Sequence, residues 1–471
     1  MEPALAPIAD AGTNLLAARY QMAFTLGFHI ILACFGVAFP AIMLIAEYRG
    51  RKRGDEEALR LARRWSKAVA VLFAVGAVSG TVLSFEFGLL WPGMMDRFGD
   101  AFGIAFAIEG IFFFLEAIFI AIYIYGWKRL PGWAHFWSGV PIVISGIGGA
   151  LSVVAANAWM NTPAGFTLGS DGRVEDVQPV DVLFNTSTFH EFVHMWVAAY
   201  LVAGFLVASI YAFQLLRGNH TRYNRLGFLI PFTVAAIGAP IQLIVGDFAA
   251  RDVYEDQPTK FAAMECVYET GDDQAENIGG ICTDGEVKGA VSIRGLDSLL
   301  AGFSTSTVVK GLNDVPPDLQ PPTPTTIHLS FDAMVGIGTF LAVLAVWFAI
   351  SWWRRRDIPQ SRWFLRAGAA SGVLAVIALE CGWMVTEIGR QPWIVSGYLR
   401  TEDAVTNAQG IWWAFALTML IYIGLALVTV YVLRGLASRP DEEAPAGDIP
   451  YAPPSEETGA GGARDRGGTV G

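Results

Sequence analysis

Residues 190–194 read HEFVH, a spacing that places two histidines one helical turn apart. In zinc metalloproteases the pattern HExxH supplies two zinc ligands and a glutamate that acts as general base. Here those roles would fall to His190, His194 and Glu191. Zinc would also need a third protein ligand, and no Asp or Glu motif on a later apolar segment supplies one. The surroundings must decide which chemistry these residues serve.

The chain that positions these residues is strongly apolar. Of its 471 residues, 54% are hydrophobic and only 16% are charged, which is too apolar for an ordinary soluble enzyme. Apolar runs of about 18 residues or more recur, each long enough to cross a bilayer. The net charge of −11 argues against nucleic acid as a partner. The sequence therefore predicts an all-α, polytopic membrane protein.

Nine membrane-spanning helices are expected, at about residues 17–46, 58–86, 100–126, 134–160, 184–215, 223–246, 326–353, 364–388 and 408–434. The connection after the first span, YRGRKRGDEEALRLARRWSK, holds eight Lys and Arg residues. The connections WKRL, LRGNHTRYNR and WWRRRDIPQSRWFLR are also basic, whereas the alternate ones carry few positive charges. The positive-inside rule therefore predicts an N-terminus outside and a C-terminus in the cytoplasm.

The spans divide the chain into four parts. Residues 1–246 hold the first six helices, and residues 326–435 hold the last three. Between them, residues 247–325 are expected to form a long, mostly polar extracytoplasmic loop. Residues 436–471 are rich in Gly, Pro and acidic residues, and predict a disordered cytoplasmic tail.

Two of the four cysteines, Cys266 and Cys282, lie in this outer loop. The outer side of most bacterial membranes is oxidising, so we expect them to form a disulfide, with two unpaired thiols as the alternative. The bridge would close a loop of about 16 residues and contribute roughly 3 kcal/mol. Cys34 and Cys381 lie within spans and are interpreted as packing residues.

Coordinating or ionisable side chains recur inside five of the spans, where their cost makes them functional candidates. The rise of a helix, about 1.5 Å per residue, converts sequence position into depth. The residues that share the outer half of the membrane, at depths of roughly 0–20 Å, are His29, Glu109, His194, Met334 and Glu387. Unrelated core residues would not be expected at one level, whereas the ligands of a shared buried site would.

Haem explains these residues better than zinc does. An electron-transferring haem commonly takes His and Met as axial ligands, and an oxygen-reacting haem keeps one axial position open. His194 and Met334 have similar depths, and the stretch SFDAMVGIG places small residues beside Met334. A methionine that fills a gap in the core is the alternative, and the residues themselves leave both interpretations open.

Several stretches together resemble subunit I of the cytochrome bd-type quinol oxidases, of the kind with a short Q-loop. The resemblance extends from about residue 15 to 435, with the motifs in the family's order. GRQPW combined with QPTKFAAME is its most specific part. The stretches are ARYQMAFTLGFHI (18–30), FAIEGIFFFLEAIF (106–119), NAWMNTPAG (157–165), FVHM (192–195), QPTKFAAME (257–265), SFDAMVG (330–336) and GWMVTEIGRQPW (382–393).

The resemblance implies a terminal oxidase subunit that oxidises quinol at the outer face and reduces oxygen to water. Protons would come from the cytoplasm, which makes the reaction electrogenic without pumping. The implied cofactors are a low-spin haem b, a high-spin haem b and a haem d. His194 and Met334 would ligate the low-spin haem. His29 and Glu387 would ligate the two high-spin haems, in an order that the motifs leave open.

The same resemblance assigns further residues. Lys260 and Glu265 match the pair in the outer loop, the Q-loop, that is associated with quinol binding. Arg390 is a candidate partner for haem propionates, and Trp383 is expected in a haem pocket. Asp332 stands where some family members carry a basic residue, which implies either that this haem edge is compensated elsewhere, with Arg390 as the candidate, or that the potential of the haem differs.

Glu109 and Glu116 are expected to carry protons. They are seven residues apart and therefore lie on nearly one face of the third span. Glu116 is deeper, at about 24 Å from the outer end. Because buried carboxyl groups can carry protons in neutral form, we expect a path from the cytoplasm through Glu116 and Glu109 to the oxygen site.

The resemblance also implies partners: a second membrane subunit (subunit II) and a possible small single-helix accessory subunit, in the bacterial cell membrane. The sequence does not distinguish ubiquinol from menaquinol. In this interpretation His190 and Glu191 are a helix-end coincidence or an outer-face polar pair. Two other functions stay open, a membrane zinc protease and a diheme electron carrier that never meets oxygen; His29 and Glu387 argue against the carrier.

Overall fold

The structure is a computed structural model that describes residues 11–283 and 285–438. Within this part, nine helices are long and apolar enough to cross a membrane, which confirms the predicted all-α polytopic fold. They are α1 (Ala11–Arg53), α2 (Glu56–Leu90), α3 (Pro92–Gly126), α4 (Gly132–Asn161), α6 (Thr188–Leu216), α7 (Arg222–Asp256), α10 (Pro324–Arg355), α11 (Arg362–Gly389) and α13 (Ile411–Ser438). The expectation for the tail 436–471 falls almost entirely outside the described residues.

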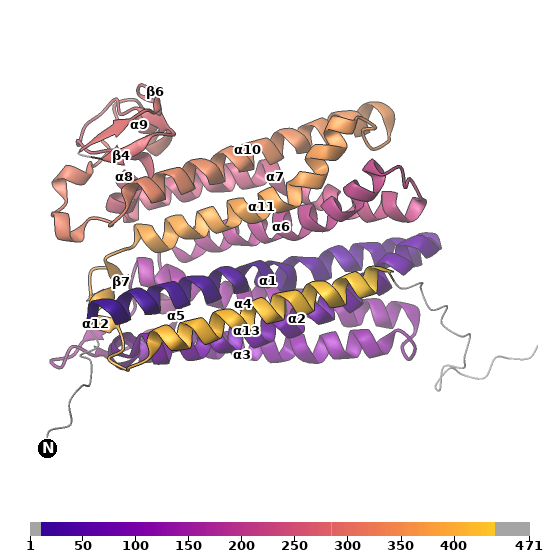
Figure 1. Ribbon diagram of the computed structural model, residues 1–471, viewed down its shortest axis with the longest axis horizontal. Coiled ribbons are helices and arrows are strands. Elements are labelled where there is room, and N and C mark those ends of the chain that lie inside the picture. The colour runs from indigo at the N-terminus through magenta and orange to yellow at the C-terminus, as the bar shows by residue number, and fades with distance from the viewer. Residues whose placement is uncertain (1–10, 284, 439–471) are drawn as a thin grey trace, which may run out of the picture.

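The long helices run side by side in two groups (Figure 1). One group contains α6, α7, α10 and α11, and the other contains α1 to α4 and α13. α1 joins the groups, because it packs on α2 and α4 in its own group and on α6 in the other. Helices suit this environment because they satisfy their backbone hydrogen bonds internally, which a bilayer core requires.

Small residues allow the helices to approach closely. A Cβ atom added at Gly204 of α6 would lie 2.8 Å from the carbonyl oxygen of Pro231 on α7. One added at Gly372 of α11 would lie 2.6 Å from the Cα atom of Leu206 on α6. Membrane helices associate mainly through such close van der Waals packing, since lipid offers no hydrophobic drive between them.

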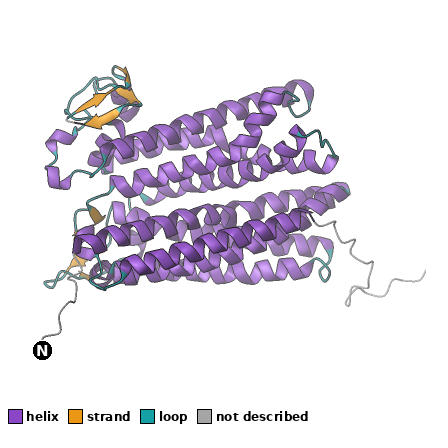
Figure 2. Ribbon diagram, viewed as in Figure 1, coloured by secondary structure: helices purple, strands orange, loops and turns teal. Residues whose placement is uncertain are grey.

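Short elements cap the end of the bundle at which α1 begins (Figures 1 and 2). Between α7 and α10 the chain forms α8 (Pro258–Glu265), α9 (Leu296–Gly302) and four strands. The strands are β3 (Glu276–Ile278), antiparallel to β6 (Val291–Ile293), and β4 (Ile281–Thr283), antiparallel to β5 (Glu286–Lys288). The remaining short elements are β1 (Thr167–Leu168), β2 (Val174–Glu175), α5 (Pro179–Leu183), β7 (Trp393–Val395), β8 (Leu399–Arg400) and α12 (Thr401–Ala404).

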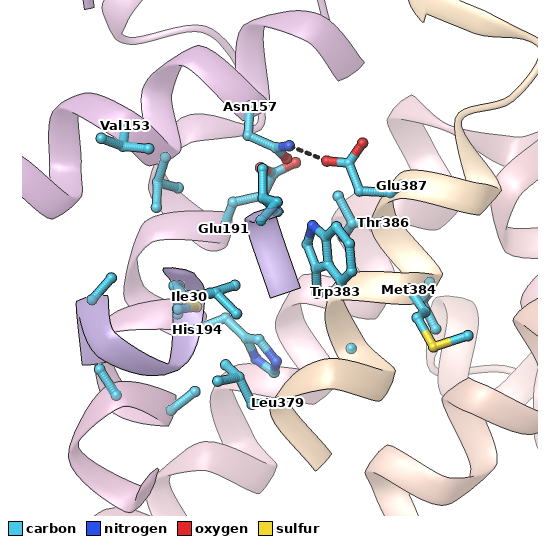
Figure 3. A pocket seen from close by; sticks show the side chains of 18 of the residues that line it. Ile30, Val153, Asn157, Glu191, His194, Leu379, Trp383, Met384, Thr386 and Glu387 are labelled. Atoms are coloured by element: carbon cyan, nitrogen blue, oxygen red, sulfur yellow. Dashed lines mark hydrogen bonds between the residues drawn. The ribbon is translucent and has the colours of Figure 1, made fainter. Parts of the chain in front are cut away.

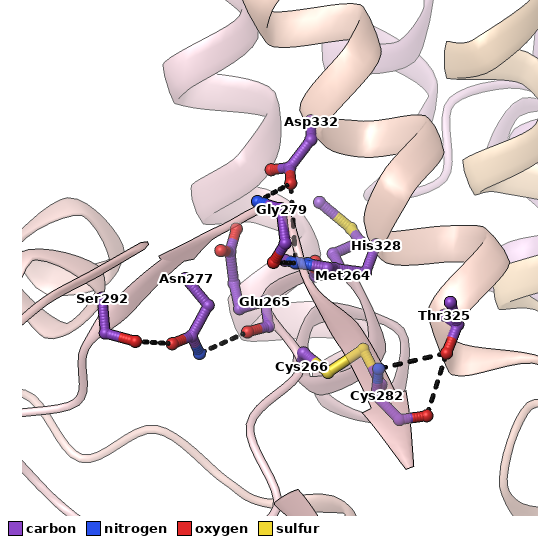
Figure 4. Close-up of a disulfide and its surroundings, with 10 residues drawn as sticks. All are labelled: Met264, Glu265, Cys266, Asn277, Gly279, Cys282, Ser292, Thr325, His328 and Asp332. Atoms are coloured by element: carbon purple, nitrogen blue, oxygen red, sulfur yellow. Dashed lines mark hydrogen bonds and ion pairs between the residues drawn. A yellow bond between two sulfur atoms is a disulfide. The ribbon is translucent and has the colours of Figure 1, made fainter. Parts of the chain in front are cut away.

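The loop between α7 and α10 is therefore folded, and it starts later than the expected boundary at 246, because α7 continues to Asp256. As predicted, Cys266 and Cys282 form a disulfide, with their Cα atoms 5.8 Å apart. It joins the C-terminal end of α8 to β4 (Figure 4). The bridge fixes the position of α8, which carries Lys260 and Glu265.

Replacing both bridging cysteines by serine should loosen this loop. A closed loop of 16 residues contributes on the order of 3 kcal/mol, so we expect the Cys266→Ser/Cys282→Ser protein to be cut faster between α7 and α10 in limited proteolysis. The control is Cys381→Ser, which removes a free thiol on α11. Equal cleavage rates in the two variants would contradict the prediction.

Candidate functional site

A cavity of about 1520 Å³ lies within the bundle and extends to the folded loop. Residues from α1, α2, α3, α4, α6, α7, α8, α10 and α11 line it. Every side chain that the sequence assigned to the site lines this one cavity: His29, Glu109, Glu116, His194, Lys260, Glu265, Met334, Trp383, Glu387 and Arg390. The structure thus brings together residues that are more than 350 positions apart in the chain.

His29 on α1 presents one free ring nitrogen. Its Nδ1 lies 2.8 Å from Ser79 Oγ, and that hydroxyl donates its own hydrogen to the carbonyl of Gly76 at 3.0 Å. Ser79 Oγ must therefore accept a hydrogen bond from His29 Nδ1, which leaves Nε2 as the nitrogen with a free lone pair. A metal-binding histidine is commonly oriented by such a bond at its other nitrogen.

Each of three candidate ligands lies against a glycine. An added Cβ would lie 2.9 Å from His29 Cε1 at Gly80, and 3.4 Å from His194 Cε1 at Gly246. At Gly382 it would lie only 2.7 Å from Met334 Sδ. The glycines on α2, α7 and α11 therefore leave the space that the two imidazoles and the thioether occupy.

His194 on α6 lies against Gln242 of α7. The Gln242 amide nitrogen is 3.2 Å from both ring nitrogens, and it also donates to the backbone carbonyl of His194 at 3.2 Å. In Figure 3 the His194 ring lies between Leu379 and the Trp383 indole. Trp383 Nε1 is buried and has no hydrogen-bond partner, so a polar donor is directed into the cavity.

Glu387 and Arg390 lie one turn apart near the end of α11. Glu387 accepts hydrogen bonds from Asn157 at 2.7 Å and from the Arg390 guanidinium. Arg390 is buried, and its Nε lacks a partner. Each carboxylate oxygen has two lone pairs, so Glu387 can accept a further bond, and the Arg390 Nε–H can donate one.

A hydrogen-bond network connects Glu387 to Lys260 through two asparagines of α4. Asn161 accepts from Lys260 Nζ at 2.9 Å, and Asn161 donates to Asn157 at 3.3 Å. Asn161 also donates to Glu191 at 2.9 Å. Figure 3 shows Asn157, Glu191 and Glu387 converging on the same region of the cavity. The loop lysine and the carboxylate of α11 thus share one network.

Lys260 is 5% exposed. Burial lowers its pKa to about 8; the nearby Arg390 acts in the same direction, and the carboxylates of Glu191 and Glu387 oppose it. The lysine nevertheless keeps two oxygen acceptors, Asn161 and Gln257. It is placed to present an ammonium hydrogen to the cavity.

The interpretation of Glu191 as a helix-end coincidence or outer-face polar pair is wrong. Glu191 lines the cavity and accepts the hydrogen bond from Asn161. His190 lies apart from it, with Nδ1 3.1 Å from Asp252 Oδ2 of α7. Only the geometry of α4 against α6 reveals the role of the glutamate in the network.

Glu265 and Lys260 do not form a pair, although both lie on α8. Glu265 is 4% exposed, so it is not a solvated loop acid. Its carboxyl group faces Glu276 and Asp297. Burial and these neighbouring carboxylates raise the pKa of Glu265 well above its usual range. Lys260 and Glu265 therefore belong to two different clusters on opposite sides of one short helix.

Asp332 faces the loop rather than the cavity. Its Oδ2 accepts the backbone N–H of Gly279 at 2.6 Å. One turn earlier, His328 contacts the carbonyl oxygens of Met264 at 2.7 Å and Gly279 at 3.0 Å. Both partners are backbone carbonyl oxygens, and the His328 ring also lies 3.5 Å from Asp332 (Figure 4). The acid that departs from the family pattern thus fastens the loop to α10.

Glu109 and Glu116 both line the cavity from α3. Glu116 is 9% exposed, and its Oε1 has no hydrogen-bond partner. A Cβ added at Gly36 of α1 would lie 3.6 Å from that oxygen. The carboxyl group therefore faces α1 across the cavity, with one oxygen free to bind a proton.

Sequence reasoning missed four polar residues of the site, Ser79, Asn157, Asn161 and Gln242, and it gave Glu191 no part in the site. The spacing of Asn157 and Asn161, four residues apart at the end of a span, was a usable signal. Ser79 and Gln242 had none, because single polar residues in an apolar helix are commonplace.

The donor set fits iron porphyrins. It offers two imidazoles, a thioether and a carboxylate. Imidazole and thioether are known haem ligands, and the carboxylate offers an anionic oxygen, as the tyrosinate ligand of some haems does. The unpartnered donors of Trp383 and Arg390 suit a group with negatively charged edges. The cavity also exceeds the roughly 300–1,000 Å³ of a pocket for one drug-sized ligand. The fold and the site together define a membrane protein that holds large cofactors between its helices.

Comparison with known proteins gives the same class. Residues 17–440 match the family described as cytochrome bd terminal oxidase subunit I. A Bacillus subtilis protein named as a cytochrome bd menaquinol oxidase subunit I is 34% identical, over 89% of this chain and 96% of its own length. A cytochrome bd ubiquinol oxidase subunit 1 from the same organism is 30% identical, over 84% and 86%.

The solved structure of the bd oxidase from Geobacillus thermodenitrificans is similar as well. It has a TM-score of 0.84 and 35% identity, and the match covers 90% of this chain and 98% of that one. This chain belongs to the cytochrome bd terminal oxidase subunit I family, a family of haem-containing, membrane-embedded quinol oxidases.

Gly382→Ala should displace Met334, because the new Cβ would lie 2.7 Å from its sulfur. We expect an altered reduced-minus-oxidised visible spectrum of the haems. The matched control is Gly336→Ala on α10, where an added Cβ has no neighbouring atom within 4 Å. Identical spectra for the two variants would show that Met334 is not held against an iron.

Proposed function

We propose that this chain is the haem-bearing subunit of a terminal oxidase that oxidises quinol at the outer membrane face and reduces oxygen to water. Protons for water formation come from the cytoplasm, so turnover is electrogenic without pumping. The observation that carries the proposal is the single cavity lined by all the candidate residues. The names of the relatives, menaquinol and ubiquinol oxidase subunits, support the same substrate class.

His194 and Met334 would hold a low-spin haem b, and His29 and Glu387 would hold a high-spin haem b and a haem d. When bound, these haems would supply reversible electron transfer and the reduction of oxygen. The protein residues orient the ligands: Ser79 fixes the tautomer of His29, and the glycines beside the ligands admit them. Arg390 and Trp383 offer hydrogen-bond donors for the propionates and the pocket wall.

Quinol would bind where α8 meets the outer end of the cavity. Lys260 would donate a hydrogen bond to a quinol oxygen and is linked through Asn161 and Asn157 to Glu387. Glu265 on the other side of α8 would accept a quinol proton. Oxidation of quinol releases two protons with two electrons, so a nearby carboxylate acceptor is required.

Glu116 and Glu109 would pass protons from the cytoplasm to the oxygen site. Both residues lie on one face of α3 and line the cavity. Glu116 Oε1 has no hydrogen-bond partner. A partnerless buried carboxyl group can take up a proton and rotate without first breaking a hydrogen bond. These features suit a relay that operates in neutral form.

The proposal also includes an orientation of the helical bundle in the membrane. The basic connections between helices lie at the end of the bundle opposite the folded loop, so that end would be cytoplasmic and the short Q-loop and α1 start would face outside. Exposed apolar side chains such as Phe114 on α3 and Trp413 on α13 would contact lipid, the second subunit or a small single-helix subunit in the bacterial cell membrane.

The zinc-protease alternative needs a third ligand beside His190 and His194. Within the part of the chain that the structure describes, the one trio of possible ligand atoms is Glu265, Glu276 and Asp297, which includes neither histidine. No observation favours that alternative.

The test is a quinol oxidase assay on the purified complex together with its reduced-minus-oxidised spectrum. We expect quinol-dependent oxygen consumption and bands of haem b and haem d. A colourless protein, or a coloured one that does not oxidise quinol, would refute the proposal.

Lys260 should produce an alkaline limit on quinol binding. Because its pKa is lowered to about 8, the ammonium group loses its proton as pH rises through about 8, and KM for quinol should rise above that pH. Lys260→Met should raise KM at pH 7 by roughly tenfold or more, the loss of one charged hydrogen bond.

In Lys260→Arg the alkaline rise should disappear, because guanidinium stays charged. Lys310→Arg, an exposed loop lysine, is the control. An unchanged alkaline limb in Lys260→Arg would assign the titration to another group.

Glu116→Gln should slow proton delivery to the oxygen site and lower oxygen consumption by about a hundredfold. Reduction of the haems by quinol in the absence of oxygen should stay normal. The control is Glu86→Gln, a buried carboxylate outside the cavity lining that is bonded to Gln21 and Thr25. Normal oxygen turnover in Glu116→Gln would rule out the path.

A further inference from the structure

Three carboxyl groups of the folded loop converge at one point. Glu265 comes from the end of α8, Glu276 from β3 and Asp297 from α9. One oxygen atom of each lies within 4.8 Å of the other two. Glu265 and Asp297 are 4% and 1% exposed, and Glu276 is half-buried. We call these residues the acidic trio.

Positive charge near the acidic trio is scarce. The titratable groups that face it from α10 are Asp332, which adds a fourth carboxyl group, and the His328 ring. Lys260, on the same short helix, is directed to the network of Glu191 and Asn161 instead. With all acids ionised, four carboxylates would face a single histidine, an arrangement that burial makes costly.

The trio also has unused ligand atoms. Neither oxygen of Asp297 has a hydrogen-bond partner, and Glu265 Oε2 has none either. Buried carboxylate oxygens are normally bonded. An unpartnered oxygen of Asp297 lies within 4.8 Å of an oxygen of each of the other two acids, which indicates a ligand between them. The same residues line the outer end of the cavity, which gives that point access from outside the core.

We propose that the acidic trio binds a divalent cation of the calcium class. The three carboxylate oxygens lie within 4.8 Å of one another, close enough for one cation to contact all three. Calcium takes 6–8 oxygen ligands in flexible geometry, which three carboxylates from separate loop elements can begin to supply, whereas magnesium demands a near-ideal octahedron and keeps most of its water. Zinc prefers nitrogen and sulfur ligands, of which the trio has none.

A cation here would join α8, β3 and α9, and so complement the disulfide at the end of α8.

Protons shared among the acids are the competing explanation. Glu265 and Glu276 are within hydrogen-bond reach of each other, which requires that one of them be protonated when no cation is present. Burial also raises the pKa of Asp297 to about 7. The experiment must therefore separate a bound metal from bound protons.

The experiment measures calcium binding by the complete purified oxidase, without quinol. After treatment with EGTA, calcium or magnesium is added back, and bound metal and thermal unfolding are recorded. We expect roughly one calcium per chain and a higher unfolding temperature with calcium than with magnesium. Asp297→Asn and Glu276→Gln should each weaken calcium binding by about tenfold or more, through loss of a charged ligand.

Asp272→Asn and Glu286→Gln are the matched controls, since both are exposed acids of the same loop outside the trio. If Asp297→Asn does not assemble, the half-buried Glu276 carries the test. Absence of calcium binding in the wild type, or equal binding in Asp297→Asn and Asp272→Asn, would overturn the proposal in favour of shared protons. If the protein oxidises quinol but binds no calcium, the cation site is refuted and the proposed function stands. If it binds calcium but does not oxidise quinol, the proposed function is refuted and the cation site stands.

Discussion

The structure depends on how charged side chains are stabilised where the folded loop between α7 and α10 meets the helical bundle. A lysine or carboxylate removed from water is tolerated only when other groups replace its hydration. Lys260 meets that requirement with two side-chain acceptors and two nearby carboxylates. Its partners come from α4, α6 and α11. The buried charge of this one loop residue is therefore stabilised only while these three helices keep their positions relative to one another.

The short helix α8 makes two such sets of charge possible at once. It buries Lys260 toward the cavity and Glu265 toward the loop. A cationic side chain and an anionic one would neutralise each other if they met, and neither would then be available to a substrate. Because α8 separates them, a quinol at this end of the cavity could meet a hydrogen-bond donor from one side and a proton acceptor from the other.

Much of this architecture could be predicted from sequence because a bilayer constrains it. The nine spans follow from the length that crosses hydrocarbon. The rise of a helix predicted that His29, His194 and Met334 share one level, and all three line the same cavity. The partners of those residues could not be predicted. Glu191 looked like part of a chance motif, and only the packing of α4 on α6 brings it to Asn161. Hydrogen bonds between distant helices leave no periodic trace in the sequence.

Asp332 departs from the family pattern, but it has a structural role in this chain, because it accepts a hydrogen bond from the loop. With His328 one turn away, it holds both backbone groups of Gly279, so one face of α10 clamps the loop. Met334 follows two residues later, on the part of α10 that lines the cavity. A basic residue at 332 would have left the N–H of Gly279 without its acceptor. The acid at this position therefore ties the placement of the loop, and with it the acidic trio, to the helix that carries the thioether.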